Sequence, residues 1–169
     1  MKEAKKFNSS FNKRTVLVNS FFGLENPIAM PPNFVITGPL YKQPGDLRAI
    51  LKEKDEKLYN WMEEALEKKI SIVYISIGSE VKWQQWSIDV MYEGLKKLKD
   101  TRVIWSLRNT GDLKKPEGNE NFWISDWVPQ IEILSHPAIK AGLTHCGMGG
   151  TLEFINMGVP AVLWPHCGD

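Results

Sequence analysis

The chain has 169 residues, of which 43% are hydrophobic and 24% charged, and its formal net charge is +1. This length and composition fit one globular domain with a flanking segment, and they exclude a disordered or fibrous protein. Because acidic and basic residues balance, the charge gives no reason to expect nucleic acid or an anionic membrane as a partner.

Two further features of the composition bear on the cellular compartment. The two cysteines, Cys146 and Cys167, do not form the evenly spaced framework of a small secreted protein, so reduced thiols are expected. The polar segment 1–14 has no signal-peptide core, and no apolar run reaches the ~18 residues of a membrane span. A cytoplasmic location is the default prediction, and membrane association of a longer gene product stays open.

The first expected elements lie between residues 14 and 69. A β-branched run at 15–18 predicts a strand, and the five prolines that follow between 27 and 44 predict an extended connector. From Asp55 to Lys69, apolar residues recur at helical spacing with charges between them, which predicts an amphipathic helix.

From Ile70 onward, strand-like and helix-like segments alternate. Strands are expected at 71–77, 102–107, 122–124, 141–144 and 160–164, and helices follow the first, third and fourth of them. The first of these helices is expected to bury one stripe, formed by Trp83, Trp86, Val90, Leu95 and Leu98. The alternation predicts an α/β fold with a Rossmann-like parallel sheet and helices on both faces, whose ligand binds beyond the carboxyl ends of the strands.

A glycine-rich segment, His145 to Thr151, lies between an expected strand and an expected helix. Its three glycines let the backbone approach a ligand, and a helix start offers amide hydrogens and a positive dipole end to a phosphate. His145 can add a further donor, and Glu153 can accept hydrogen bonds from ribose hydroxyls. The alternative is a purely structural turn in which Glu153 stabilises the helix start.

Trp127 favours the ligand-binding interpretation. It follows an expected strand and precedes Pro129, so its indole is well placed to stack on a flat base, worth about 1 to 3 kcal/mol. Gln130 supplies both a donor and an acceptor. The other tryptophans, such as Trp83 and Trp86, are expected to be packing residues.

The segment 127–169 contains seven short motifs: WVPQ at 127–130, EIL at 132–134, HP at 136–137, THCG at 144–147, TLE at 151–153, GVP at 158–160 and WPHCGD at 164–169. In order and spacing they resemble the signature box of the UDP-dependent glycosyltransferases of the plant and animal glucosyl- and glucuronosyltransferase type. Upstream, residues 73–79 resemble the strand and turn that open the donor domain of that family, and residues 17–40 resemble its interdomain region.

The resemblance implies a GT-B fold, with two Rossmann-like domains facing across a cleft. Residues 1–40 would then be the tail of the acceptor domain, and residues 41–69 a linker with a helix. Residues 70–169 would be the nucleotide-sugar (donor) domain, incomplete at its C-terminal end. The expected partners are a UDP-sugar and, through the first domain, a small lipophilic acceptor.

The same resemblance assigns residues to the nucleoside. Trp127 would stack on uracil beside Val128, and Gln130 and Glu153 would hold the ribose. Arg108, at the end of the second strand, is a further candidate for the nucleotide site. Its alternative interpretation is a solvated charge at a strand end.

The diphosphate and sugar would be held by a second group of residues. This group is Gly78, Ser79, His145, Gly147, Met148, Gly149, Gly150 and Asp169. Plant members commonly have Trp-Asn-Ser where this chain has Met148-Gly149-Gly150, so backbone amides would have to replace the side-chain contacts. The family also continues after Asp169 with a Gln that helps select the sugar, which leaves the donor sugar open.

The implied reaction is displacement at the anomeric carbon with inversion, without an obligatory metal or cofactor. The base of the family is a His of the first domain, which neither His136 nor His166 matches, so the chain alone is expected to bind UDP-sugar but to transfer little. Two alternatives are a non-catalytic nucleotide-sugar module and the donor subunit of a split transferase. Metal binding by His145, Cys146, His166 and Cys167 lacks the usual ligand spacing.

Overall fold

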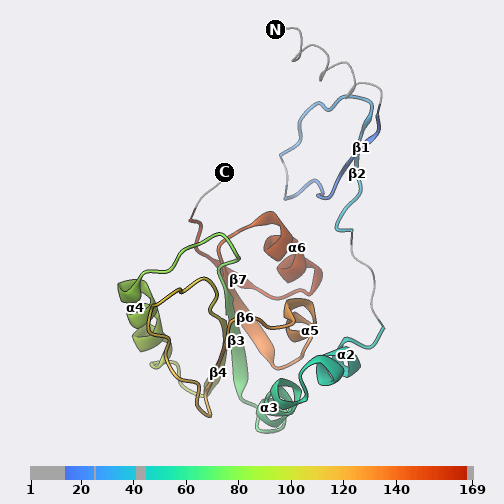
Figure 1. The fold of residues 1–169 in the computed structure, drawn as a ribbon. Helices are drawn as coiled ribbons and strands as arrows, with labels where there is room; N and C mark the ends of the chain where they lie inside the picture. Colours follow the sequence, from blue (N-terminus) through green and yellow to red (C-terminus); the bar gives the residue numbers. More distant parts are fainter. Residues whose placement is uncertain (1–13, 25, 41–44, 167–169) are drawn as a thin grey trace. The chain divides into compact units, whose positions relative to one another are not determined.

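The computed structural model describes residues 14–24, 26–40 and 45–166 (Figure 1). The described residues up to Leu40 belong to one unit and those from Gly45 onward to a second. Cys167 and Asp169 lie outside the described residues. None of the described helices has the length and apolar character needed to cross a membrane.

The first unit contains two short parallel strands. Strand β1 (Val16–Val18) pairs in register with strand β2 (Phe34–Ile36). The strand at 15–18 was predicted, whereas β2 was assigned to the proline-rich connector. Its three residues follow two consecutive prolines and are too few to show a strand periodicity of their own.

The second unit is built on a five-stranded sheet whose strand order is β5-β4-β3-β6-β7. The strands are β3 (Ser71–Ser76), β4 (Thr101–Ser106), β5 (Phe122–Ser125), β6 (Ile139–Thr144) and β7 (Ala161–Leu163). All neighbours pair in parallel, which confirms the predicted Rossmann-like sheet. Strand β3 lies between β4 and β6, so the chain reverses its direction of winding beside β3.

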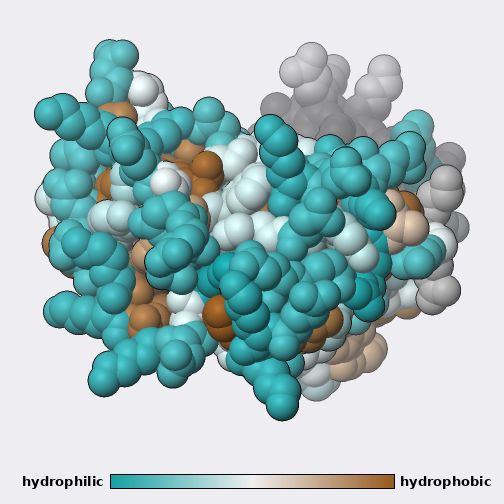
Figure 2. All heavy atoms as spheres, turned by 90° about the horizontal axis from the view of Figure 1, so that it is seen from below, coloured by the Kyte–Doolittle hydropathy of each residue, from teal (hydrophilic) through white to brown (hydrophobic). Residues whose placement is uncertain are grey.

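Helices cover both faces of this sheet (Figure 1). They are α2 (Leu47–Lys54), α3 (Glu56–Glu67), α4 (Gln85–Leu95), α5 (Gln130–Leu134) and α6 (Met148–Asn156). Residues of α2, α3, α5 and α6 form one apolar cluster with the sheet, and α4 contributes to the cluster on the other face. Hydrophilic residues cover most of the side seen in Figure 2, which is viewed from the end where α3 lies in Figure 1.

Helix α3 confirms the predicted amphipathic helix. The Asp55 side chain accepts a hydrogen bond from the backbone N–H of Leu58 at 2.9 Å and so caps the helix start. Helix α2 was not predicted. It begins after Asp46, whose side chain accepts from two backbone N–H groups, and it is short and rich in charged residues.

The predicted apolar stripe of helix α4 is wrong in part. Trp86 and Val90 are 63% and 67% exposed, whereas Ile88 is buried. Trp83 precedes the helix and packs edge-on against Trp105 at a centroid distance of 5.5 Å. Because Trp83 is not part of the helix, the helical spacing counted from it selected the wrong face.

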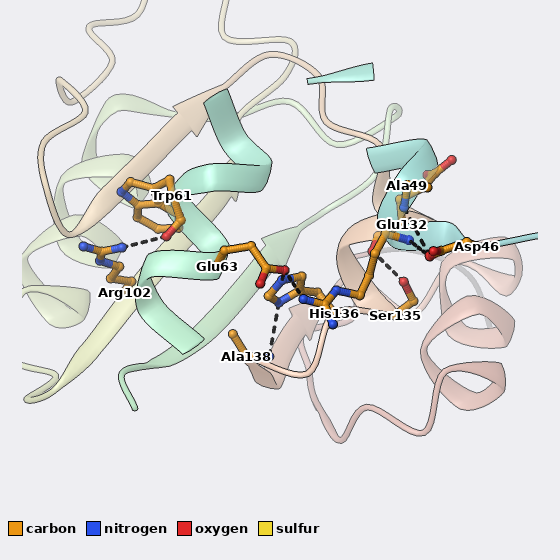
Figure 3. A network of polar contacts seen from close by, with 10 residues as sticks. Asp46, Ala49, Trp61, Glu63, Arg102, Glu132, Ser135, His136 and Ala138 are labelled. Carbon is orange, nitrogen blue, oxygen red and sulfur yellow. Dashed lines mark hydrogen bonds and ion pairs between the residues drawn. The ribbon is translucent and has the colours of Figure 1, made fainter. Parts of the chain in front are cut away.

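A polar network ties α2, α3 and the start of β6 together (Figure 3). His136 is 1% exposed; its Nε2 lies 2.9 Å from Glu63, and its Nδ1 accepts from Ala138 N at 3.2 Å. Arg48 of α2 forms an ion pair with the same Glu63. Burial opposes ionisation of Glu63, but its bonds with Arg48 and His136 outweigh burial and lower the Glu63 pKa. A neutral imidazole with its proton on Nε2 satisfies both of its contacts.

Acidification is expected to destabilise the fold through this histidine. Burial lowers the pKa of His136 below its ordinary 6.5, although Glu63 opposes that shift. Below the ordinary value the unfolded chain therefore binds a proton that the folded chain refuses, so stability is lost as the pH falls through 6.5. Thermal unfolding on both sides of this pH checks the effect.

A His136→Gln variant is the comparison for this pH dependence. It should unfold at a lower temperature than the parent at neutral pH, but its melting temperature should fall less steeply on acidification. Equal slopes for parent and variant would contradict the role of His136.

Candidate functional site

A cavity of about 420 Å³ lies at the carboxyl ends of the central strands, beside the point where the sheet changes its direction of winding. This is the usual ligand position in open parallel sheets. Most of the residues predicted from the sequence border it. They are Gly78, Ser79, Arg108, Trp127, Val128, Gln130, His145, Gly149, Gly150 and Glu153.

Trp127 presents an exposed ring at the cavity, since 58% of the residue is accessible. The hydroxyl of Ser125, the last residue of β5, donates to the Trp127 carbonyl at 2.8 Å and fixes the turn. Val128 is only 2% exposed, and its side chain packs in the core. The polar groups that Val128 can offer a ligand are therefore those of its backbone. An exposed indole held by a rigid turn is a stacking surface for a planar ring.

Gln130 and Glu153 are joined in a hydrogen-bonded chain that begins in the core. The hydroxyl of buried Tyr74 donates to Gln130 Oε1 at 2.7 Å, and Gln130 Nε2 donates to Glu153 Oε2 at 2.5 Å. Burial raises the pKa of Tyr74, so its hydroxyl stays protonated and orients the Gln130 amide. Burial also raises the pKa of Glu153; the bond from Gln130 opposes this shift and the charge of Glu132 adds to it. A carboxylate has two oxygens, so Glu153 keeps acceptor capacity for a ligand hydroxyl.

His145 follows strand β6 and packs between two glycines. A Cβ at Gly78 or at Gly147 would overlap its imidazole ring, and Gly78 also has a positive φ of 75°. Burial lowers the pKa of His145, with a further contribution from His166, so the ring is neutral at pH 7. Nδ1 is buried and has no hydrogen-bond partner among the described residues. A neutral imidazole keeps one N–H to donate to an anion in the cavity.

The start of helix α6 forms part of the cavity edge. Its N-cap, Gly147, makes no side-chain capping bond, and Gly149 and Gly150 border the cavity. Backbone N–H groups and the positive dipole end at a helix start favour a bound anion. A Cβ at Gly149 would meet no atom within 4 Å, so the protein packing itself leaves room there.

Two predicted residues do not border the cavity, and one lies outside the described residues. Met148 is 49% exposed and is absent from the cavity lining. Gly147 acts on the site indirectly, because it leaves room for the ring of His145. Asp169 lies outside the described residues. Arg108 borders the cavity, but its Nε donates to the Asp126 carbonyl at 2.9 Å.

The sequence interpretation missed four polar residues of the cavity: Ser76, Thr144, Lys54 and Glu132. Ser76 and Thr144 are the last residues of β3 and β6 and stand in register, and Ser106 of β4 continues the row. Their position at the carboxyl ends of predicted strands could have indicated that Ser76 and Thr144 lie at the cavity. No such indication existed for Lys54, because its helix α2 was not predicted.

Within the described part of the chain, no group of three or more His, Cys, Asp or Glu side chains is arranged to hold a metal ion. The alternative metal set included Cys167, which lies beyond the described residues.

The family model described as "UDP-glucoronosyl and UDP-glucosyl transferase" matches residues 3–169. The chain belongs to this family. Among curated relatives, a UDP-glycosyltransferase of Talaromyces amestolkiae is 32% identical over 178 residues, covering 91% of this chain and 32% of the relative. A cinnamate beta-D-glucosyltransferase of Fragaria ananassa is 31% identical over 172 residues, covering 91% and 30%. The chain thus spans about a third of the length of these relatives.

Solved glycosyltransferase structures resemble the chain as well. A UDP-glucosyltransferase of Polygonum tinctorium, in complex with 3,4-dichloroaniline, aligns with a TM-score of 0.67 and 28% identity over 89% of this chain and 35% of its own. Arabidopsis thaliana UGT89C1 complexed with UDP aligns with a TM-score of 0.60 and 29% identity over 68% of this chain and 28% of its own. The family and the Rossmann-like fold of the GT-B type that the sequence predicted are confirmed.

Proposed function

We propose that this chain is the donor-binding part of a UDP-glycosyltransferase, which transfers a sugar from a UDP-sugar to the hydroxyl of a small acceptor with inversion. One observation carries the proposal: the exposed indole of Trp127, the Gln130–Glu153 pair and His145 all border one cavity. These groups supply a stacking surface, hydrogen-bonding partners for a diol and a donor for an anion.

The roles follow from the chemistry of each group. Uracil stacks on Trp127, with the polar backbone of Val128 beside its edge. The ribose hydroxyls contact Gln130 and Glu153. The diphosphate lies near Ser79, His145 and the start of helix α6. The proposal draws support from a relative structure in complex with UDP and another in complex with UDP-L-rhamnose.

In this proposal, the chain binds the donor and stabilises the departing UDP. Oriented amides at the start of α6 and the N–H of His145 favour the charge that develops on the leaving diphosphate. No described residue is proposed as the base that takes the acceptor proton. We therefore expect the purified chain to bind UDP-sugars with little transfer, and to bind UDP equally well when EDTA removes divalent metals.

Removing the imidazole tests the diphosphate role. A His145→Ala variant should bind UDP about tenfold more weakly than the parent, because a charge-assisted hydrogen bond is lost. Uridine lacks the diphosphate, so its affinity should change less than about threefold. Isothermal titration calorimetry with both ligands gives the two ratios.

The outcome for the parent chain decides the proposal itself. Saturable binding of UDP to the parent supports it, and no detectable UDP binding by a folded parent chain would refute it. An equal loss for UDP and uridine in the variant would instead place His145 away from the diphosphate.

A further inference from the structure

The last residue of helix α2 brings a cation to the nucleotide cavity. Lys54 forms an ion pair with Glu132, which lies 78 residues later in the first turn of helix α5. Both residues border the cavity. The side chain of Glu132 is 10% exposed and that of Lys54 is 45% exposed, so the pair spans the boundary between core and solvent.

Glu132 belongs to an acidic edge of the cavity. It lies near Glu153, since its charge adds to the raised pKa of that carboxyl group. A nucleoside diphosphate is itself an anion, so two uncompensated carboxylates beside it would oppose binding. Among the described residues that border the cavity, Lys54 and Arg108 carry a positive charge. Arg108 donates a hydrogen bond from Nε to the Asp126 carbonyl, whereas Lys54 pairs with the carboxylate of Glu132.

The ion pair also links two helices. Helix α2 contacts α5, and α5 carries Gln130 at its start, two residues before Glu132. Leu51, one turn before Lys54, is fully buried in the apolar cluster that contains residues of α5. Removing one partner of a partly buried pair leaves the other charge uncompensated, which is costly.

We propose that Lys54 is a positioning residue of the nucleotide cavity that acts through charge: its ion pair with Glu132 offsets the carboxylate charge beside Gln130 and Glu153. This inference rests on the proposed function, because it takes a nucleoside diphosphate as the ligand. Lys54 acts through Glu132 and need not touch the ligand.

The test compares four variants by titration calorimetry with UDP and with uridine: Lys54→Met, Lys54→Arg, Glu132→Gln, and the double variant Lys54→Met/Glu132→Gln. Lys54→Met should weaken UDP binding about tenfold and uridine binding less than about threefold, because only UDP is an anion. Lys54→Arg keeps the charge and should bind UDP like the parent. The double variant removes both charges and should recover UDP affinity to within about threefold of the parent.

Lys52→Met is the matched control, because Lys52 is an exposed lysine of the same helix that does not border the cavity. It should bind UDP like the parent. Circular dichroism confirms that each variant is folded before titration. If Lys54→Met and the double variant lose UDP affinity equally, or if UDP and uridine are weakened equally, the inference is overturned. If the parent binds no UDP, the proposed function is refuted. If the parent binds UDP and Lys54→Met binds UDP with the same affinity, this inference alone is refuted.

Discussion

Replacing Trp127 by Ala is expected to weaken UDP binding by about fivefold to 150-fold, since stacking of a base on an indole is worth about 1 to 3 kcal/mol. The fold should be largely unaffected, because the residue is 58% exposed and neither apolar cluster includes it. Calorimetric titration with UDP and with uridine should show similar losses, because both ligands carry the uracil ring.

Trp86 offers a matched control for this prediction. It is 63% exposed, lies on helix α4 and does not border the cavity. Trp86→Ala should therefore bind UDP like the parent. Equal affinity of the parent and Trp127→Ala would remove the stacking role, and a loss in both tryptophan variants would point to a general effect of removing an indole.

Gly142→Ala is expected to destabilise the fold by about 2 to 3 kcal/mol, because it overpacks the core. Gly142 lies in strand β6, where an added Cβ would overlap the ring of Phe154 and come 2.8 Å from the carbonyl oxygen of Tyr74. The ring could shift, but the carbonyl belongs to the neighbouring strand β3 and is held by the sheet. Chemical denaturation measures the change in the free energy of unfolding.

Gly94→Ala is the control substitution of the same size. An added Cβ at Gly94 would meet no atom within 4 Å, and the residue lies in helix α4, where Ala is favoured over Gly by about 0.5 to 1 kcal/mol. The two variants should therefore change stability in opposite directions. A Gly142→Ala variant as stable as the parent would show that the sheet and Phe154 relax around the methyl group.

The sheet could be predicted from the sequence because two of its central strands each contain a short apolar run. Strand β3 contains the apolar run 72–75 and is followed by Gly78, and β4 contains the apolar run 103–105. Buried parallel strands need no alternation, so such runs are distinctive when helical segments separate them. Helix α2 could not be predicted on these grounds, since its one fully buried residue, Leu51, gives no periodicity.

The candidate site could be assembled because its local motifs follow different strands of one parallel sheet. Carboxyl ends of parallel strands meet at one edge, so Trp127 after β5 and His145 after β6 were expected to approach each other. The role of Gly147 was not predictable, because the space it leaves for His145 depends on how the loops fold together. Lys54 was missed for a related reason: only the tertiary packing of α2 on α5 brings it to the cavity.

Ser76 and Thr144, which stand in register and border the cavity, have a consequence for selectivity. Hydroxyl groups that border a cavity form hydrogen bonds with water, and a molecule that enters must replace those hydrogen bonds or leave the hydroxyls desolvated. An oily compound of suitable shape cannot replace them, so it is disfavoured even where it fits. The hydroxyl groups at the ends of strands β3 and β6 thus disfavour apolar ligands before any loop contributes to recognition.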